Sequence, residues 1–436
     1  MNTVKQFFKY TSQSVAGMVG ISVYILADTF FISLYSGADG LAVLNLILPV
    51  YGLIYAIGAM VGIGSATRYS ICRARGENID FYFIQSILWS LILSIPFIVV
   101  GIFFPGQLLW ALGADDTLIA LGKNYLRIML VATPFFMTNY TFTAFARNDY
   151  APTLAMMGAL AGSLFNIVFD YVFMFVFNLG FSGAALATVF CPGVTMAVCS
   201  IHFLGRKNQV GFRWKKPALS GLISCCSLGV SAFVGEISSA VTTIVFNMLI
   251  LGLAGNVGVA AYGVVANLSI VAMSIFNGLA QGAQPLISDN YGKGHNKQVK
   301  DLLLYSLLLC LVIEAVIVGL AWGKTDFLVG IFNSENSQEL LGYAHTGLRL
   351  YFLGFLLAGI NIVLVMYFSA VDNTKPAIVG SLMRGVIAIA VCAIVLSKIF
   401  GLQGVWMSFL SSEVITFFVI FLLSGRIRGR KNAADS

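Results

Sequence analysis

The stretch from Asp301 to Trp322, DLLLYSLLLCLVIEAVIVGLAW, decides the fold class, because between its two ends only Glu314 is charged. An α-helix rises about 1.5 Å per residue, so roughly 20 apolar residues cross a hydrocarbon layer about 30 Å thick. A strand of a membrane barrel would instead alternate apolar and polar residues over about ten positions. The segment therefore predicts a transmembrane helix.

Similar apolar runs recur along the whole chain. Of its 436 residues 59% are hydrophobic and only 10% are charged, whereas roughly 25% are charged in an ordinary soluble domain. The predicted spans are 11–35, 40–67, 81–105, 120–145, 152–176, 181–204, 218–251, 257–286, 301–322, 345–369, 377–398 and 403–425. We therefore predict an all-α integral membrane protein with twelve transmembrane helices.

Basic residues follow this topology, so the net charge of +7 does not indicate a nucleic-acid partner. Most of the 25 lysine and arginine residues fall on the side that holds both ends of the chain. The opposite side carries only Lys123, Arg127, Lys324, Arg349 and Lys398. Because positive loops stay in the cytoplasm, we expect a multi-pass protein of the bacterial inner (cytoplasmic) membrane with both termini cytoplasmic. The first apolar run is read as a helix and not as a cleaved signal peptide.

Enzyme motifs are missing from the sequence. The seven cysteines show no CxxC spacing, the three histidines are not in HExxH spacing, and no GxSxG occurs. We therefore expect no enzyme activity, no cofactor and no structural metal site, and keep a membrane enzyme only as the alternative from another functional class.

The chain contains a weak internal repeat. With a shift of 218 residues, a set of small residues in the first half falls on small residues in the second half: Gly40, Ala42, Gly64 and Gly76 fall on Gly258, Ala260, Gly282 and Gly294. After small length changes Pro152 matches Pro376, and Gly180 and Gly183 match Gly401 and Gly404. This predicts two pseudo-symmetric six-helix bundles, namely an N-terminal lobe (1–204) and a C-terminal lobe (218–436), joined by a basic cytoplasmic linker (205–217). Parallel repeats of this kind are typical of transporters.

Ionisable residues inside the predicted helices are costly, so each is a functional candidate. They are Asp28, Asp170, Glu236, Glu314, Arg384 and Glu413. Glu236 is a candidate for binding a cationic substrate or a second proton, or it pairs with helix partners. Glu314 and Glu413 are read as structural or cavity-lining, and Arg384 can neutralise one of them.

Four oxygen-bearing side chains in the N-terminal half are expected to converge, namely Asp28, Asn166, Asp170 and Thr188. Asn166 and Asp170 are four residues apart and share a helical face. Asp170 and Thr188 lie equally far from the turn near residue 179, and Asp28 lies as far from its own turn. Oxygen ligands suit Na⁺, and a carboxylate held in a low-dielectric interior suits a proton equally well. The alternative is that Asp28 and Asp170 only hold helices together through hydrogen bonds.

Over nearly its whole length the sequence resembles the multidrug and toxic compound extrusion (MATE) family, and it looks closest to the MepA-like bacterial branch. The motifs that carry the resemblance are Ala27-Asp28-Thr29-Phe30-Phe31, Arg147 to Pro152 leading into Asn166-x-x-x-Asp170, Gly183-Ala-Ala-Leu-Ala-Thr188, and Gln281-Gly-Ala-Gln-Pro285 followed by Asn290-Tyr291-Gly292.

This resemblance implies two lobes of six helices, with a central drug cavity and export driven by entry of H⁺ or Na⁺. It implies that Asp28, Asn166, Asp170 and Thr188 form the family's cation site in the N-terminal lobe, bordered by Asn139 and Tyr140. It also implies that Glu236 corresponds to a functional glutamate of the seventh helix, so Glu236, Asn139 and Tyr140 are candidates for a substrate site or a second proton site. We therefore expect a monomeric antiporter for amphipathic or cationic small molecules; a flippase for lipid-linked oligosaccharides of the same superfamily is the alternative.

Overall fold

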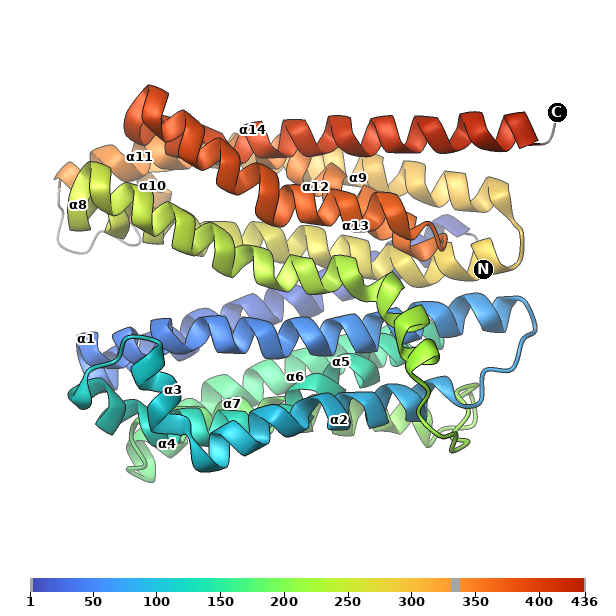
Figure 1. Ribbon diagram of the computed structural model, residues 1–436, viewed down its shortest axis with the longest axis horizontal. Coiled ribbons are helices and arrows are strands. Elements are labelled where there is room, and N and C mark those ends of the chain that lie inside the picture. Colours follow the sequence, from blue (N-terminus) through green and yellow to red (C-terminus); the bar gives the residue numbers. More distant parts are fainter. Residues whose placement is uncertain (1–2, 331–337, 435–436) are drawn as a thin grey trace.

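The computed structural model describes residues 3–330 and 338–434, and all regular elements in these ranges are helices (Figure 1). The first half of the chain forms α1 (Thr3–Ala74), α2 (Tyr82–Phe103), α3 (Pro105–Ala111), α4 (Asp116–Val131), α5 (Thr133–Asn148), α6 (Pro152–Tyr171), the π-helical turn η1 (Val172–Val176) and α7 (Phe181–Phe203). The second half forms α8 (Leu219–Gly292), α9 (Asn296–Gly323), α10 (Thr325–Gly330), α11 (Gln338–Phe352), α12 (Phe355–Ala370), α13 (Thr374–Leu382), the π-helical turn η2 (Met383–Ile387) and α14 (Ala388–Ala434).

The number of membrane spans agrees with the prediction. Eight helical segments are long and apolar enough to cross a membrane, and ten if each of two bent pairs counts as one span. The bent pairs are α4 with α5, at 45°, and α11 with α12, at 44°. Two of the eight segments, α8 with 74 residues and 374–424 with 51 residues, are each more than twice the roughly 20 residues of one span. Each of these is broken at a glycine, so dividing them gives the twelve predicted spans.

Four glycines with nearly the same backbone conformation turn the chain at one end of the molecule. Their φ and ψ angles are 58° and −142° at Gly37, 57° and −138° at Gly180, 61° and −158° at Gly255, and 58° and −136° at Gly401. This region of backbone space is essentially restricted to glycine. Gly37 matches Gly255 in the repeat, and Gly180 matches Gly401, so the same turn closes the equivalent hairpins of both halves.

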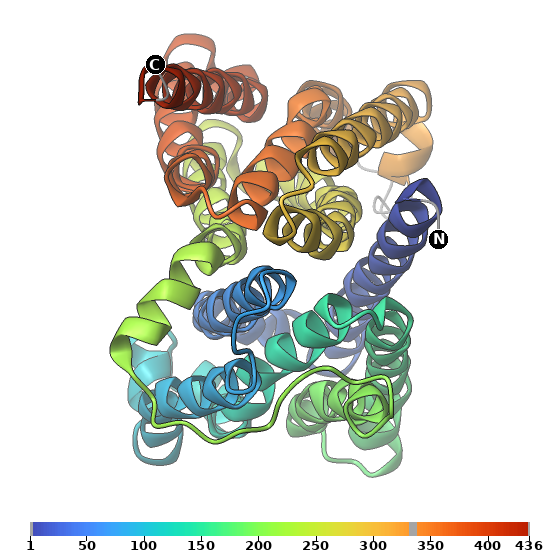
Figure 2. The ribbon, with the colours of Figure 1, turned by 90° about the vertical axis from the view of Figure 1, so that its right-hand side faces the viewer.

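Helices α1 to α7 pack as one bundle and α8 to α14 as another, as the blue-to-green and yellow-to-red layers in Figure 1 show. The segment 205–217 crosses one face of the first bundle before α8 begins (Figure 2). Helix α1 begins and α14 ends at the same end of the molecule (Figure 1). That end, which also holds Arg73, Lys293 and Lys375, is called the basic end below, and the glycine turns lie at the opposite, far end.

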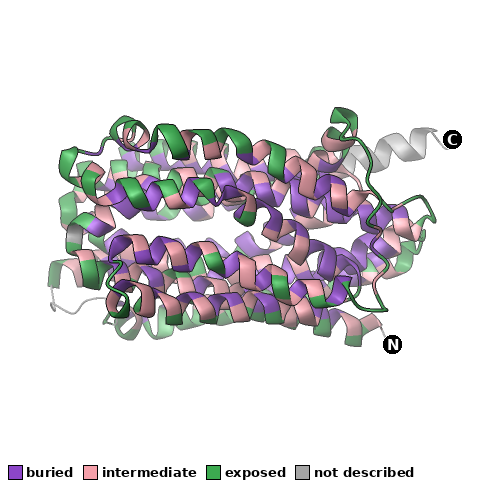
Figure 3. Cartoon of the chain, turned by 90° about the horizontal axis from the view of Figure 1, so that it is seen from below, coloured by how far each residue is buried: buried purple, intermediate pink, exposed green. Residues whose placement is uncertain are grey.

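Apolar side chains face outward, as a lipid environment requires. Between residues 301 and 320 of α9 the exposed residues are apolar, and the large ones follow helical spacing: Leu304, Leu308, Leu311, Val312, Val316 and Leu320. The buried face of the same helix carries Ser306, Cys310 and Glu314. Figure 3 shows the same arrangement for the whole chain, with buried residues gathered between the helices and exposed ones on the outside.

Some helix boundaries differ from those predicted. Helix α1 begins at Thr3, before the predicted residue 11, and the spans predicted at 120–145 and 345–369 are each bent. Pro134 explains the first bend, because proline lacks an N–H and disrupts the preceding helical turn. At the second, the backbone of Gly354 packs so closely on Phe409 that a Cβ atom would overlap its ring. The short helices α3 and α10 at the far end were not predicted.

The two bundles meet through close backbone contacts near the basic end. A Cβ atom on Gly64 would overlap the Cys225 carbonyl oxygen, and one on Gly229 would overlap that of Met60. In the equivalent contact, a Cβ on Gly278 would lie 2.6 Å from the Cα of Val15. The GxxxG pair Gly278 and Gly282 thus joins the second half of α8 to the first part of α1, as small residues do between membrane helices.

Candidate functional site

The structure brings together the four oxygen-bearing side chains predicted in the first half of the chain. Asn166 and Asp170 lie on α6, and the Asn166 amide Nδ2 donates a hydrogen bond to Thr188 Oγ1 on α7 at 3.4 Å. The carboxyl groups of Asp28, on α1, and Asp170 are close enough to interact electrostatically. Three helices therefore converge on one polar point inside the first bundle.

Local sequence explains how α6 presents these residues. Gly158 and Gly162 allow α6 to pack closely on α7, because a Cβ on either would lie 2.9 Å from a carbonyl oxygen of α7. The Thr195 hydroxyl then donates to the Gly158 carbonyl oxygen at 3.1 Å. Asp170 occupies the end of α6, just before the π-helical turn η1, and such turns are often found at functional sites.

The two carboxyl groups are buried without donors. Asp170 is fully buried and Asp28 is 9% exposed. Among the described residues, nothing donates a hydrogen bond to Asp28 Oδ1, to either oxygen of Asp170 or to Asn166 Oδ1. Two neighbouring carboxylates in a low-dielectric interior repel each other strongly, so a bound cation or proton is needed to hold both. The described residues include no group of three His, Cys, Asp or Glu side chains that could hold a metal ion.

Glu236 and Tyr140, both predicted as candidates for substrate binding, contact each other across the two bundles. The Tyr140 hydroxyl on α5 donates to Glu236 Oε1 on α8 at 2.9 Å. The ring of Tyr55 lies 6.1 Å from that of Tyr140 and 5.6 Å from that of Phe136. An anionic side chain beside aromatic rings is an arrangement that attracts organic cations. Asn139, the third candidate, does not join this contact, and its Oδ1 has no donor among the described residues.

Of the three ionisable side chains Glu314, Arg384 and Glu413 in the second bundle, two form an ion pair. Arg384, on η2, donates to Glu413 Oε1 at 2.8 Å, so it neutralises Glu413 as the sequence suggested. The Asn361 amide Nδ2 donates to Glu413 Oε2 at 2.7 Å. Glu314 accepts from the Ile360 N–H at 3.0 Å and from the Cys310 thiol at 3.5 Å.

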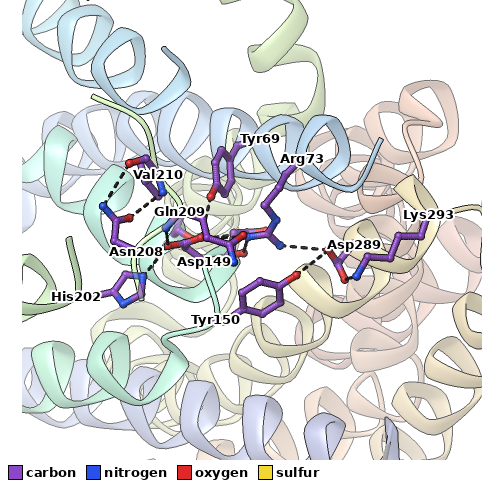
Figure 4. A network of polar contacts seen from close by, with 12 residues as sticks. Tyr69, Arg73, Asp149, Tyr150, His202, Asn208, Gln209, Val210, Asp289 and Lys293 are labelled. Carbon is purple, nitrogen blue, oxygen red and sulfur yellow. Dashed lines mark hydrogen bonds and ion pairs between the residues drawn. The ribbon is translucent and has the colours of Figure 1, made fainter. Parts of the chain in front are cut away.

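A polar network at the basic end was not predicted from the sequence (Figure 4). Its centre is Asp149, which is fully buried between α5 and α6. The Tyr69 hydroxyl donates to Asp149 at 2.8 Å, the Arg73 guanidinium at 3.2 Å and the Gln209 N–H at 2.9 Å. His202 Nε2 lies 2.7 Å from the same carboxylate. Asp149 therefore ties α1, α7 and the connecting segment together.

The same network joins the two bundles. Arg73 donates to Asp289 Oδ1 on α8 at 3.2 Å, and the Tyr150 hydroxyl donates to that oxygen at 3.1 Å (Figure 4). Burial raises the pKa of the Tyr150 hydroxyl, which keeps it protonated and able to donate. Lys293 also donates to Asp289, at 2.6 Å. A second ion pair, between Arg68 and Asp372 at 2.8 Å, adds to this junction, so the bundles are held together at the basic end.

The sequence carried too little information to find this network. Asp149 follows the predicted span 120–145, and Asp289 follows 257–286, so both looked like ordinary polar residues at helix ends. Their shared partner, Arg73, lies more than 70 residues before the first and more than 200 before the second. Only the packing of the bundles brings them together.

Comparison with known proteins identifies relatives of the whole chain. The MatE family model matches residues 14–172 and 232–394. Multidrug export protein MepA of Staphylococcus saprophyticus is 28% identical over 425 residues, which cover 95% of this chain and 93% of that protein. A crystal structure of a MATE protein in complex with MaL6 superposes with a TM-score of 0.91 at 22% identity, covering 98% of this chain and 96% of that one. An outward-facing multidrug resistance MATE family transporter of the MOP superfamily gives 0.90 at 21% identity, with the same coverage.

Proposed function

The chain belongs to the MatE family of membrane transporters, and from that premise we propose that it exports amphipathic, often cationic, small molecules in exchange for H⁺ or Na⁺. It is a transporter and not an enzyme. Its relatives named multidrug export proteins, which match almost end to end, support drug-like substrates. The multi-pass helical fold and these bacterial relatives place it in a bacterial membrane.

The observation that carries ion coupling is the pair of buried carboxyl groups of Asp28 and Asp170 with their unpartnered oxygens. Burying this pair without a ligand would cost several kcal/mol per charge. A proton or Na⁺ relieves that cost, and the Asn166 and Thr188 oxygens would complete the coordination of a metal cation. The coupling ion is thus a transported substrate and not a resident cofactor.

Substrate binding is supported by Glu236 and its aromatic surroundings. Its carboxyl group lies at the junction of the bundles and accepts a hydrogen bond from Tyr140, and the residue is only partly buried. An organic cation would be held there by charge and by the faces of Tyr55 and Tyr140. Because this position lies between the two bundles, their relative movement can open it to either side of the membrane.

The transport cycle follows from linkage between the two ligands. In the state described, Arg73–Asp289 and Arg68–Asp372 hold the basic end closed. We take the basic end as cytoplasmic, so this state would release substrate outward and accept the coupling ion at Asp28 and Asp170. An ion can drive the cycle only if it binds one state more tightly than the other. Its release to the cytoplasm then resets the N-terminal lobe, and a monomer suffices because the site lies within one chain.

A flippase for lipid-linked oligosaccharides is the weaker candidate. Binding a pyrophosphate requires cationic side chains that are free to contact it. Arg384, the basic residue inside a predicted helix, is instead paired with Glu413 at 2.8 Å. No described contact favours the flippase over the exporter.

The decisive experiment uses proteoliposomes with the purified chain and ethidium as a fluorescent amphipathic cation. Ethidium movement should be driven by a pH gradient or by a Na⁺ gradient, and a comparison of the two identifies the coupling ion. Asp28→Asn and Asp170→Asn should each remove gradient-driven transport, because the neutral amide cannot exchange a cation.

Thr29→Ala is the matched control for these variants. Thr29 adjoins Asp28 but bonds only to the Ile25 carbonyl oxygen of its own helix; transport should be unchanged. If both asparagine variants, correctly folded and inserted, were still driven by the gradient at the normal rate, the site assignment would be wrong.

A further inference from the structure

A second candidate ion site lies in the other bundle, around Glu314 on α9. Its side chain is only 1% exposed, although it carries a carboxyl group. One oxygen, Oε1, accepts from the Ile360 N–H at 3.0 Å. The other, Oε2, is buried and has no donor among the described residues. Half of this carboxyl group is therefore left without a hydrogen-bond partner.

The neighbouring arginine does not neutralise Glu314. Arg384 lies 2.8 Å from Glu413, and Glu413 receives a further hydrogen bond from Asn361 at 2.7 Å. Arg384 and Glu413 therefore cancel as one pair. Glu314 feels the negative charge of Glu413 and has no base of its own, so one uncompensated negative charge would remain in the interior of this bundle.

The surroundings of Glu314 favour a proton over a metal cation. Its other neighbours are the Cys310 thiol on the same helix and the backbone of α12 at Gly359 and Ile360. The further unpartnered oxygen of this cluster is Asn361 Oδ1. Hard divalent cations bind about six oxygen ligands, far more than are free here. The positive charge of Arg384 also repels a second cation, whereas a proton needs only one oxygen.

We propose that Glu314 is a second proton-binding site, built into the C-terminal lobe, which takes up and releases one H⁺ in each transport cycle. A proton from water forms an O–H bond at Oε2, converting the unpartnered oxygen into a donor, and returns to water when the bond breaks. No electron transfer is involved. The proposal rests on the proposed function in one respect, namely that ion entry drives export.

A short series of neighbouring residues connects Glu314 to Arg384. Glu314 accepts from the Ile360 N–H, the adjacent Asn361 donates to Glu413, and Glu413 pairs with Arg384, whose side chain is 10% exposed. Arg384 lies in the π-helical turn η2, and the next residue, Gly385, packs against Ser238 of α8, two residues after Glu236. Protonation of Glu314 can therefore change the electrostatic environment of the substrate-binding region through the Glu413–Arg384 pair.

The first test is infrared difference spectroscopy of the purified protein, with and without ethidium, in H₂O and in D₂O. The wild type should show the C=O stretch of a protonated carboxylic acid that is lost in Glu314→Gln and that changes when ethidium is added. Glutamine keeps an acceptor for the Ile360 N–H, which favours normal folding. If the variant does not accumulate, Glu314→Met, of similar volume, replaces it.

Two results would overturn the proposal. One is a wild-type spectrum without any band that depends on Glu314, and the other is a Glu314 band that does not respond to ethidium. Neither involves Asp28 or Asp170, so failure here is distinguishable from failure of the proposed function.

The second test counts protons. In proteoliposomes, the ethidium gradient that balances a known pH gradient gives the number of protons exchanged per ethidium. That number should fall by one in Glu314→Gln. Ser306→Ala is the matched control, because Ser306 is equally buried on α9 and bonds only to the Leu302 carbonyl oxygen; it should keep the wild-type ratio. A wild-type ratio in Glu314→Gln would contradict the proposal.

Discussion

At the scale of single residues, what distinguishes this interior is the difference between charges that have partners and charges that lack them. Glu413 is buried but satisfied, by Arg384 and by the Asn361 amide. Asp170 is buried just as completely and has no hydrogen-bond donor in the part of the chain that the structure describes. The first kind of residue holds a fold together, whereas the second must bind something, because an unpaired charge in a low-dielectric interior is too costly to keep.

A residue-scale prediction concerns Glu236. Replacing it with glutamine removes the negative charge beside Tyr140 and Tyr55 while leaving the aromatic rings in place. The KM for ethidium transport should rise about tenfold, the factor that corresponds to about 1.4 kcal/mol of lost attraction. Transport assays in proteoliposomes at several ethidium concentrations would measure it.

Tyr140→Phe serves as the control for this variant, because it removes the hydroxyl that bonds Glu236 and keeps the charge and the ring. Its KM should change less than that of Glu236→Gln. An uncharged amphipathic substrate should be affected by neither substitution. Equal affinity of Glu236→Gln and wild type for ethidium would show that the cation binds elsewhere.

At the scale of helices, sequence and structure agree where one pattern decides the outcome. Long apolar runs sufficed to predict the membrane spans. The repeat and the positions of its glycines sufficed to predict that the spans form two matching halves. Helical spacing and distance from the turns also placed Asp28, Asn166, Asp170 and Thr188 at one depth, and the structure brings them together. The bends at Ala132 and Gly354 depend on local packing as well, so an apolar pattern alone could not reveal them.

An element-scale prediction tests the close contact between α1 and α8. Gly64→Ala puts a methyl group against the Cys225 carbonyl oxygen, and such overpacking costs roughly 1–3 kcal/mol. The melting temperature of the purified protein in detergent should fall. Gly52→Ala, on the same helix but with nothing within 4 Å of the added methyl, should leave it unchanged or raise it slightly.

A result in which both alanine variants melt at the same temperature would count against a tight contact at Gly64. The increase in melting temperature on adding ethidium provides a second measurement. A variant whose bundles no longer meet closely should be stabilised less by the ligand.

At the scale of the whole molecule, the network around Arg73 and Asp289 decides which end is closed. It joins residues that lie far apart in the sequence, and single-sequence patterns contain no signal for such pairings. Asp289 accepts from Arg73, Tyr150 and Lys293, so the acid contributes both the charge and the hydrogen bonds. Moving the bundles apart at the basic end must break these contacts.

This leads to a prediction for Asp289→Asn. Breaking one partner of a buried charge pair is strongly destabilising for the closed arrangement, by about 3–5 kcal/mol in other buried pairs. The population open at the basic end should therefore increase. Spin labels on the two bundles at that end, measured by pulsed electron resonance, should report longer distances than in the wild type.

Lys297→Gln is the control, because Lys297 is exposed on α9 and makes no contact between the bundles among the described residues. Its distance distribution should match the wild type. An unchanged distribution in Asp289→Asn would mean that the glycine contacts alone keep this end closed.

The connecting segment 205–217 has a consequence for how the halves can move. It is fastened to the first bundle by Gln209 at Asp149, by the Arg213 N–H at the Asp80 carbonyl oxygen, 2.9 Å away, and by Gln85 at the Lys216 carbonyl oxygen. Only the few residues between Lys216 and the start of α8 at Leu219 are left as a free linker. So short a linker keeps the two halves at a high effective concentration. The halves can therefore pivot about this linker but cannot drift apart in the bilayer.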